Sequence, residues 1–143
     1  MKGRRRFLIF ALLIFSILAS PTLSDGLIHF TLIIDYGGAP RLKIGKLIVR
    51  SVTYNLSAPA GLTLFDATSL IAKVAYKRGS YGIYITSING VEERIISKSE
   101  GYSWLWFIYD NSTRKFVLGA VACDKYVIKD GDMIMWKYSH WKF

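Results

Sequence analysis

Two aromatic stretches near the C-terminus constrain the fold of this chain more than any other feature. Gly101–Asp110 reads GYSWLWFIYD, and Lys125–Tyr138 reads KYVIKDGDMIMWKY. Together they hold three of the four tryptophans and four of the nine tyrosines. Their bulky residues alternate or run unbroken, which is typical of strands in a sheet with both faces largely covered. The heaviest burial is therefore expected here.

The chain begins with a segment that is typical of export rather than of a fold. Lys2 and Arg4–Arg6 precede Phe7–Leu18, which is apolar except for one serine. This run is too short to cross a bilayer as a helix, and its length matches the apolar part of a signal peptide. Cleavage after Ala19 or after Ser24 and retention as an uncleaved anchor remain alternatives. We expect residues 1–24 to be a signal peptide or N-terminal membrane anchor, and residues 25–143 to form one extracytoplasmic domain.

The charge balance disfavours nucleic acid as a partner. Residues 1–24 carry four cations and no anion, so the net charge falls from +9 to +5 without them, with fifteen Lys and Arg against ten Asp and Glu. The remaining cations are scattered, whereas nucleic-acid binding needs a concentrated basic face. A membrane contact is expected only through an uncleaved N-terminal segment. The absence of Gln and the presence of only three Asn are marks of proteins from hot environments.

The order of the remaining elements predicts an α+β fold with a mostly antiparallel sheet and a single packed helix. Thr63 and Asp66 resemble a capping box, and an apolar stripe continues from Ala67 to Ala75, so a helix is expected from Thr63 to about Lys77. The predicted strands are 27–36, 42–54 with a bulge or break at Gly45, 81–88, 91–96, 104–109, 115–121 and 133–138. The turn signals between them are Asn89-Gly90, 110–113 and Asp130-Gly131, and residues 55–61 are expected to form a loop.

Several motifs, taken in this order, resemble the transcobalamin C-terminal-domain-like family over about residues 27–138. They are Asp35-Tyr36-Gly37, Gly61-Leu62-Thr63 with Asp66-Ala67, Tyr84–Val91, Gly101-x-x-Trp104-x-Trp106-x-x-Tyr109, Gly119, and Asp130-Gly131-Asp132-x-Ile134-x-Trp136-x-Tyr138. The resemblance implies a β-grasp-like ligand-binding fold, related to the domain that closes over cobalamin in intrinsic factor and transcobalamin. Cobalamin is thereby implied as a candidate ligand. Two departures are the missing room for the carriers' large helical domain and Asp110-Asn111 where the family usually has Asn-Gly.

No pattern in the sequence indicates catalysis. The two histidines, His29 and His140, lie outside any nucleophile or metal motif, with His140 expected in a short tail. Asp130 and Asp132 lack the string of oxygen ligands that a calcium loop provides. Cys123 is the single cysteine and is interpreted as a small buried hydrophobe, with an intermolecular bridge or a reactive thiol as the alternatives. We expect no enzyme activity and no metal.

The aromatic residues are the remaining candidates for a site. Trp104 and Trp106 share one face of their strand, while Leu105, Phe107 and Tyr109 share the other. One interpretation makes both faces core, under the helix and under a second sheet layer. The other makes Tyr102, Ser103 and Trp104 ligand contacts at the edge of the sheet, since rigid rings bind flat ligands at low entropy cost.

The sequence therefore leaves two functions open. One is an exported binding module for a corrinoid or another flat small ligand. The other is a cell-surface protein-interaction or structural domain, for which a homodimer through a sheet edge is one arrangement. Asn55 and Asn111 begin N-x-S/T triplets in predicted loops and are candidate glycosylation sites.

Overall fold

The computed structural model describes residues 26–37, 39, 42–44 and 47–143. The predicted export segment lies outside the described residues. Twelve elements follow one another along the chain: β1 Leu27–Asp35, β2 Leu42–Ile44, β3 Leu47–Val49, β4 Ser51–Pro59, α1 Leu64–Ile71, β5 Val74–Gly79, β6 Gly82–Ile88, β7 Val91–Glu92, β8 Arg94–Ser97, β9 Glu100–Asp110, β10 Lys115–Leu118 and β11 Met133–Lys142. The predicted α+β class is confirmed.

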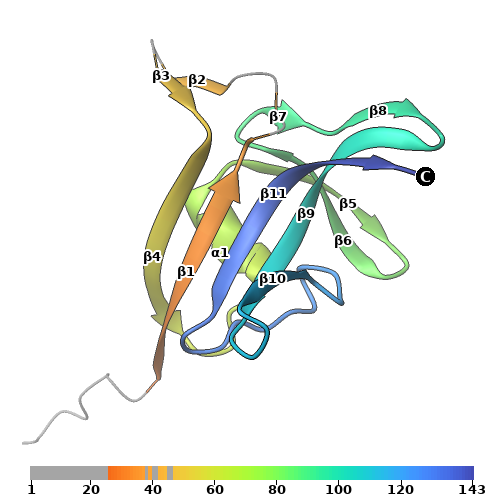
Figure 1. Cartoon of the computed structure of the whole chain (residues 1–143). Coiled ribbons are helices and arrows are strands. Elements are labelled where there is room, and N and C mark those ends of the chain that lie inside the picture. The colour runs from red at the N-terminus through yellow and green to blue at the C-terminus, as the bar shows by residue number, and fades with distance from the viewer. Residues whose placement is uncertain (1–25, 38, 40–41, 45–46) are drawn as a thin grey trace, which may run out of the picture.

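A six-stranded sheet in the order β10-β9-β11-β1-β4 forms the body of the domain, and β8 adds to one end of β9 (Figure 1). The first and last strands, β1 and β11, lie side by side and parallel, and their neighbours pair antiparallel. This central parallel pair is the β-grasp-like arrangement. β5, β6 and β7 form a separate three-stranded sheet, and β2 pairs with β3. None of the helices in the described part of the chain is long and apolar enough to cross a membrane.

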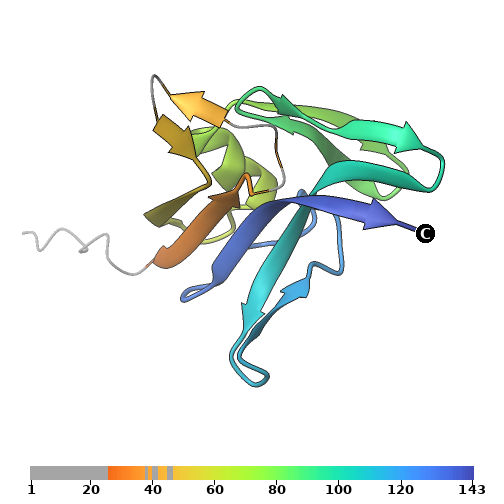
Figure 2. The same ribbon diagram turned by 45° about the horizontal axis from the view of Figure 1, so that its top comes forward.

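One face of the large sheet carries the core. On β1, Ile28, Phe30, Leu32 and Ile34 alternate with more exposed residues, as the pattern predicts. α1 and the β5–β6 hairpin lie against this face (Figures 1 and 2). Trp104 on β9 and Trp136 on β11 also lie on this face, and each is 2% exposed. The predicted burial of the aromatic stretches is confirmed for this face.

The opposite face differs from the prediction. Leu105, Phe107 and Tyr109 are half-buried, and no second sheet layer of described residues covers them. The expected second layer would need further strands, but the remaining strands of the described chain pair into the β5–β7 sheet and the β2–β3 ribbon instead. The expectation that both faces are core is therefore wrong for this face.

The helix begins as predicted and ends earlier. Thr63 Oγ1 accepts from the backbone N–H of Asp66, and the Asp66 carboxylate accepts from the N–H of Thr63, so the capping box is complete. The helix ends at Ile71, because Ala72 adopts an extended backbone with φ −142° and ψ 151°. The predicted apolar stripe is wrong beyond this point, and Leu70 is 74% exposed.

Val74–Gly79 is strand β5 rather than the second half of the helix. It pairs antiparallel with β6, where Val74 lies opposite Ile88. Asn89 anchors the start of this hairpin, because its Oδ1 accepts from the N–H of Lys73 at 2.9 Å. The β-branched and aromatic residues of β5 suit this pairing, and the hydrogen-bond partner that β6 offers outweighs the local helical pattern.

Three further boundaries differ from the predictions. Residues 55–59, expected in a loop, complete β4 and pair with β1. The expected strand 91–96 divides into β7, which pairs with β6, and β8, which pairs with β9. His140, expected in a tail, lies in β11 opposite Tyr102. In the first and third cases the partner strand extends the pairing beyond the predicted end, and in the second two different partner strands divide the predicted one.

Candidate functional site

An apolar pocket of about 390 Å³ opens between the β5–β6 hairpin and the large sheet. The tip of the hairpin forms one wall, the middle of β9 forms the floor, and the segment after β10 forms the other wall. Its lining residues are Gly79, Ser80, Tyr81, Gly82, Ile83, Tyr84, Ile85, Trp104, Leu105, Trp106, Leu118, Gly119, Val121, Ala122, Cys123 and Trp136. No lining residue is charged.

The indole N–H groups of the three pocket tryptophans all donate hydrogen bonds within the protein. Trp104 Nε1 donates to the Val91 carbonyl at 2.8 Å, and Trp106 Nε1 donates to the Val121 carbonyl at 2.9 Å. Trp136 Nε1 donates to Thr68 Oγ1 at 2.8 Å and so connects β11 to α1. With each indole N–H satisfied, these side chains offer a ligand only their apolar faces and edges.

Close backbone contacts hold the two walls together. The N–H of Ile83 donates to Asp124 Oδ1 at 2.8 Å, which ties β6 to the segment after β10. This backbone hydrogen bond to the charged carboxylate lowers the pKa of Asp124. Gly119 lies so near the Trp106 indole that a Cβ at this position would overlap the ring. Gly119 is therefore required by the packing of the pocket wall.

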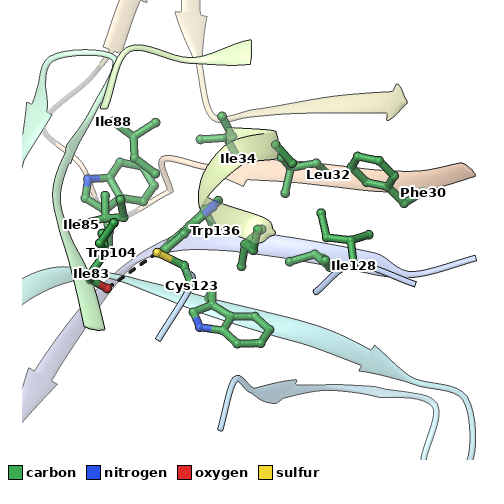
Figure 3. Packing of buried hydrophobic residues seen from close by; sticks show 14 of the residues in the cluster. Phe30, Leu32, Ile34, Ile83, Ile85, Ile88, Trp104, Cys123, Ile128 and Trp136 are labelled. Carbon is green, nitrogen blue, oxygen red and sulfur yellow. Dashed lines mark hydrogen bonds between the residues drawn. The ribbon is translucent and has the colours of Figure 1, made fainter. Parts of the chain in front are cut away.

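Cys123 lies buried at the edge of the pocket, 2% exposed, and its sulfur faces the Ile83 carbonyl at 3.7 Å (Figure 3). Burial raises the pKa of the thiol to about 11, since the charged thiolate would lose its hydration there. The thiol is free and neutral at physiological pH. The interpretation of Cys123 as a small buried hydrophobe is confirmed.

The structure separates the three residues that the sequence suggests as ligand contacts. Trp104 lines the pocket, while Tyr102 and Ser103 do not. Tyr102 is half-buried and stacks on Tyr138, with the ring centroids 5.7 Å apart. Ser103 is buried, and its Oγ lies 3.1 Å from Tyr84 Oη and accepts from Trp141 Nε1 at 2.9 Å.

Sequence reasoning missed the hairpin wall of the pocket. Tyr81 is 93% exposed at the tip of the β5–β6 hairpin, and Tyr84 follows it on β6. The helix prediction through Lys77 removed β5 and with it the hairpin that carries both tyrosines. The signal available was the pair of glycines, Gly79 and Gly82, that flank Ser80 and Tyr81, since closely spaced glycines mark a turn.

Among the described residues, each histidine ring contacts one polar side chain. His29 Nδ1 lies 2.7 Å from Ser57 Oγ, and Asp130 Oδ1 accepts from the backbone N–H of His29, not from its ring. His140 Nε2 lies 3.0 Å from Glu100 Oε1. Among the described residues, no three His, Cys, Asp or Glu side chains are close enough to hold a metal ion.

The two glycosylation triplets lie in different settings. Asn111 is exposed in the turn between β9 and β10, as predicted. Asn55 lies in the middle of β4 rather than in a loop, and its Oδ1 accepts from Thr31 Oγ1 at 3.2 Å. Its side chain is exposed on the sheet.

Comparison with known proteins adds a likeness of fold. The structure of haptocorrin in complex with Cbi superposes with a TM-score of 0.54 at 13% sequence identity. The match covers 80% of this chain but 26% of haptocorrin, so the chain corresponds to about a quarter of that protein. This likeness supports a transcobalamin-like C-terminal domain fold. Comparison with curated proteins found no significant sequence similarity.

A family model matches residues 61–140, from the residues before α1 into the last strand, β11. The match includes the hairpin, the pocket floor and Gly119, and it spans more than half of the 143 residues. The chain belongs to the family described as Domain of unknown function (DUF4430).

Proposed function

We propose that this protein is an exported, non-enzymatic binding module whose pocket takes a flat, largely apolar part of a small ligand. The observation that carries the proposal is the uncharged pocket between the β5–β6 hairpin and β9. Ligand sites are concave and mostly apolar, with aromatic side chains and few polar groups. Tyr81 and Tyr84 on one wall and Trp104 and Trp106 on the floor match that description.

A corrinoid is the first ligand to test. The likeness to haptocorrin, which was solved with Cbi, supports this class, as does the resemblance to the transcobalamin C-terminal domain. The pocket volume of about 390 Å³ lies at the lower end of the usual range for ligand sites. It accommodates one edge of a large ring, so most of a bound corrinoid would remain outside, within reach of the exposed Tyr81.

Tryptophan fluorescence tests the proposal, because three tryptophans line the pocket. The chain is titrated with cobinamide, cobalamin and a porphyrin, and free tryptophan serves as the control for light absorbed by the ligand. Saturable quenching by the corrinoids alone supports a corrinoid module. Quenching by the porphyrin as well supports the broader flat-ligand class, and no response to any of the three contradicts the proposal.

Two variants locate the binding. Tyr81→Ala removes an exposed ring without disturbing the core and should weaken binding by about fivefold or more, as loss of an aromatic contact typically does. Ala122→Phe fills the pocket and should abolish binding, whereas Ala120→Phe, on an exposed neighbour outside the lining, should not. Near-ultraviolet circular dichroism confirms that each variant is folded. Equal effects of the two phenylalanine variants would contradict this location.

A further inference from the structure

We infer that the mouth of the apolar pocket docks on an anionic lipid surface. The mouth consists of Tyr81 at the tip of the β5–β6 hairpin, Leu118 at the end of β10, and Val121 shortly after it. The inference rests on the proposed function only for the ligand that the pocket then receives. The docking itself needs no ligand, so the two can fail separately.

The three side chains of the mouth line the pocket and also project into solvent. Tyr81 is almost fully exposed, and Leu118 and Val121 are exposed as well. Tyr81 lies in the two-residue connection between Gly79 and Gly82, and this tip of the hairpin points away from β1 and β4 (Figure 1). Exposed apolar side chains gathered at the entrance of an apolar pocket mark an interaction site.

Cationic side chains flank the mouth on both walls. Lys77 and Arg78 precede the hairpin turn, and Lys125 follows the segment after β10. Lys77 Nζ lies 3.9 Å from a carboxylate oxygen of Glu93, and Lys125 Nζ lies 3.6 Å from one of Asp124. The two lysine side chains remain 75% and 62% exposed, whereas both acidic side chains are only 18% exposed. The cations therefore reach further into solvent than the anions.

Hydrogen bonds explain why the two acids stay covered. Asp124 accepts from the N–H of Ile83, and Glu93 accepts from Tyr84 Oη. Both carboxylates are thus held against the β5–β6 hairpin, while their lysine partners extend outward. Among the described residues, the outward charge around the mouth is therefore cationic, and anionic headgroups attract Lys and Arg near a membrane surface.

The shape of the mouth selects lipid as the partner. A tyrosine ring at a hairpin tip is buried on all sides only in a medium that surrounds it, such as the boundary between acyl chains and headgroups. Tyrosine suits this boundary, because its ring is apolar and its hydroxyl can stay among the headgroups. Binding there combines buried apolar area with attraction to anionic lipids. A soluble polyanion would pair with the cations but would leave the apolar side chains in water.

Docking places the entrance of the pocket at the lipid boundary. The pocket has no charged lining residue, so a ligand dissolved in that boundary would enter without crossing water. An exported chain meets such a surface on the outer side of the cell membrane. The membrane would then be the place where the binding module takes up its ligand.

A polarity-sensitive dye on Ala120→Cys tests the docking in the full chain without ligand. Ala120 is exposed between Leu118 and Val121, and Cys123 is buried and should stay unlabelled, which the wild-type chain treated with the dye checks. The emission should shift to shorter wavelength with vesicles that contain phosphatidylglycerol, but not with phosphatidylcholine alone. The dye on Thr53→Cys, on β4, is the control for insertion of another segment and should not shift.

Three variants of the labelled chain separate charge from apolar contact, with the ratio of shifted to unshifted dye as the measure of docking. Arg78→Ala should lower this ratio about fivefold, as loss of one cation near the headgroups does. Tyr81→Ser should lower it about tenfold, because the ring no longer enters the apolar boundary. Lys98→Ala removes the same charge in the turn between β8 and β9 and should leave the ratio unchanged. Near-ultraviolet circular dichroism checks that each variant is folded.

The remaining outcomes each overturn the inference. No shift with either kind of vesicle excludes docking, and an equal shift with phosphatidylcholine alone excludes recognition of anionic lipid. An equal shift of the dye on Thr53→Cys would place the contact elsewhere. Dextran sulfate that shifts the dye as the vesicles do would assign the mouth to a soluble polyanion instead. Corrinoid quenching measured without vesicles bears on the proposed function alone, which stands or falls separately.

Discussion

Cys123 and Gly119 show how single residues set the properties of the pocket wall. The Cys123 thiol faces the Ile83 carbonyl and is 2% exposed. Burial therefore lowers its reactivity and raises its pKa. Gly119 donates its N–H to the Trp106 carbonyl at 2.9 Å and approaches the indole of the same residue.

The native thiol should be inert at pH 8 toward a disulfide reagent and should react once the chain is unfolded. The folded-state pKa of Cys123 is raised from 9.0 to about 11, so the unfolded chain loses this proton first. The buried neutral thiol therefore makes its full contribution to the free energy of unfolding below about pH 9. This contribution, on the order of 2 kcal/mol, is lost as the pH rises to about 11. Denaturant unfolding across this range measures it.

The difference between the wild type and Cys123→Ala isolates the thiol, because Tyr36 and Tyr84, whose pKa values are also raised, titrate equally in both chains. A native thiol that reacts at pH 8 as fast as an unfolded one would contradict its burial.

Gly119→Ala should lower the free energy of unfolding by roughly 2 kcal/mol, because the added methyl group forces the Trp106 ring to move. Gly131→Ala is the matched control. Gly131 has a φ of +83° and open space around it, so the same substitution costs only conformational energy, about 1 kcal/mol. Chemical denaturation compares the two variants. An equal loss would show that steric contact with Trp106 is not the cause.

At the scale of elements, α1 depends strongly on its first turn because it has only eight residues. A helix this short is marginal by itself. Thr63→Ala removes the capping oxygen for the N–H of Asp66 and should destabilise the chain by about 1 kcal/mol. Ser69→Ala, on the exposed side of the same helix, should have an effect near zero. Thermal unfolding of both variants measures the difference, and equal melting temperatures would contradict the cap.

The neighbouring elements show where local pattern and structure diverge. The capping box predicted the start of α1 correctly, because a cap involves residues three positions apart. The predicted end of the helix at about Lys77 was wrong, because apolar residues continue at helical spacing into Val74–Gly79, which is strand β5. There the β6 partner and the Asn89 side chain supply hydrogen bonds that the local sequence does not contain. The pocket wall was missed for the same reason.

At the scale of the whole molecule, one buried hydrogen bond connects the helix layer to the sheet. Trp136 Nε1 donates to Thr68 Oγ1, and Thr68 donates in turn to the Leu64 carbonyl at 2.7 Å. Thr68→Val leaves the indole N–H without an acceptor and should cost roughly 1–3 kcal/mol. A double-mutant cycle with Trp136→Phe should give a coupling of about 1 kcal/mol. Independent effects of the two substitutions would show that the bond does not couple the layers.

The candidate site was predictable from the sequence only in part. Trp104 lines the pocket, as its place in the aromatic stretch suggested, and Cys123 is buried as expected. Tyr102 and Ser103 lie outside the lining, because the partners that occupy them, Tyr138 and Trp141, come from β11. A sequence identifies aromatic residues in a strand, but it does not show which of them a distant strand already covers.

The sequence by itself determined the features that neighbouring residues decide: the alternation of β1, the capping box, and the Asn89-Gly90 turn, where both residues have positive φ. These depend on side-chain spacing and backbone sterics within a few positions. Only the tertiary structure decided that β1 and β11 pair in parallel, that Val74–Gly79 is a strand, and that no described strand layer covers the second face of the large sheet. Those outcomes depend on hydrogen-bond partners and covering layers contributed by segments far apart in the chain.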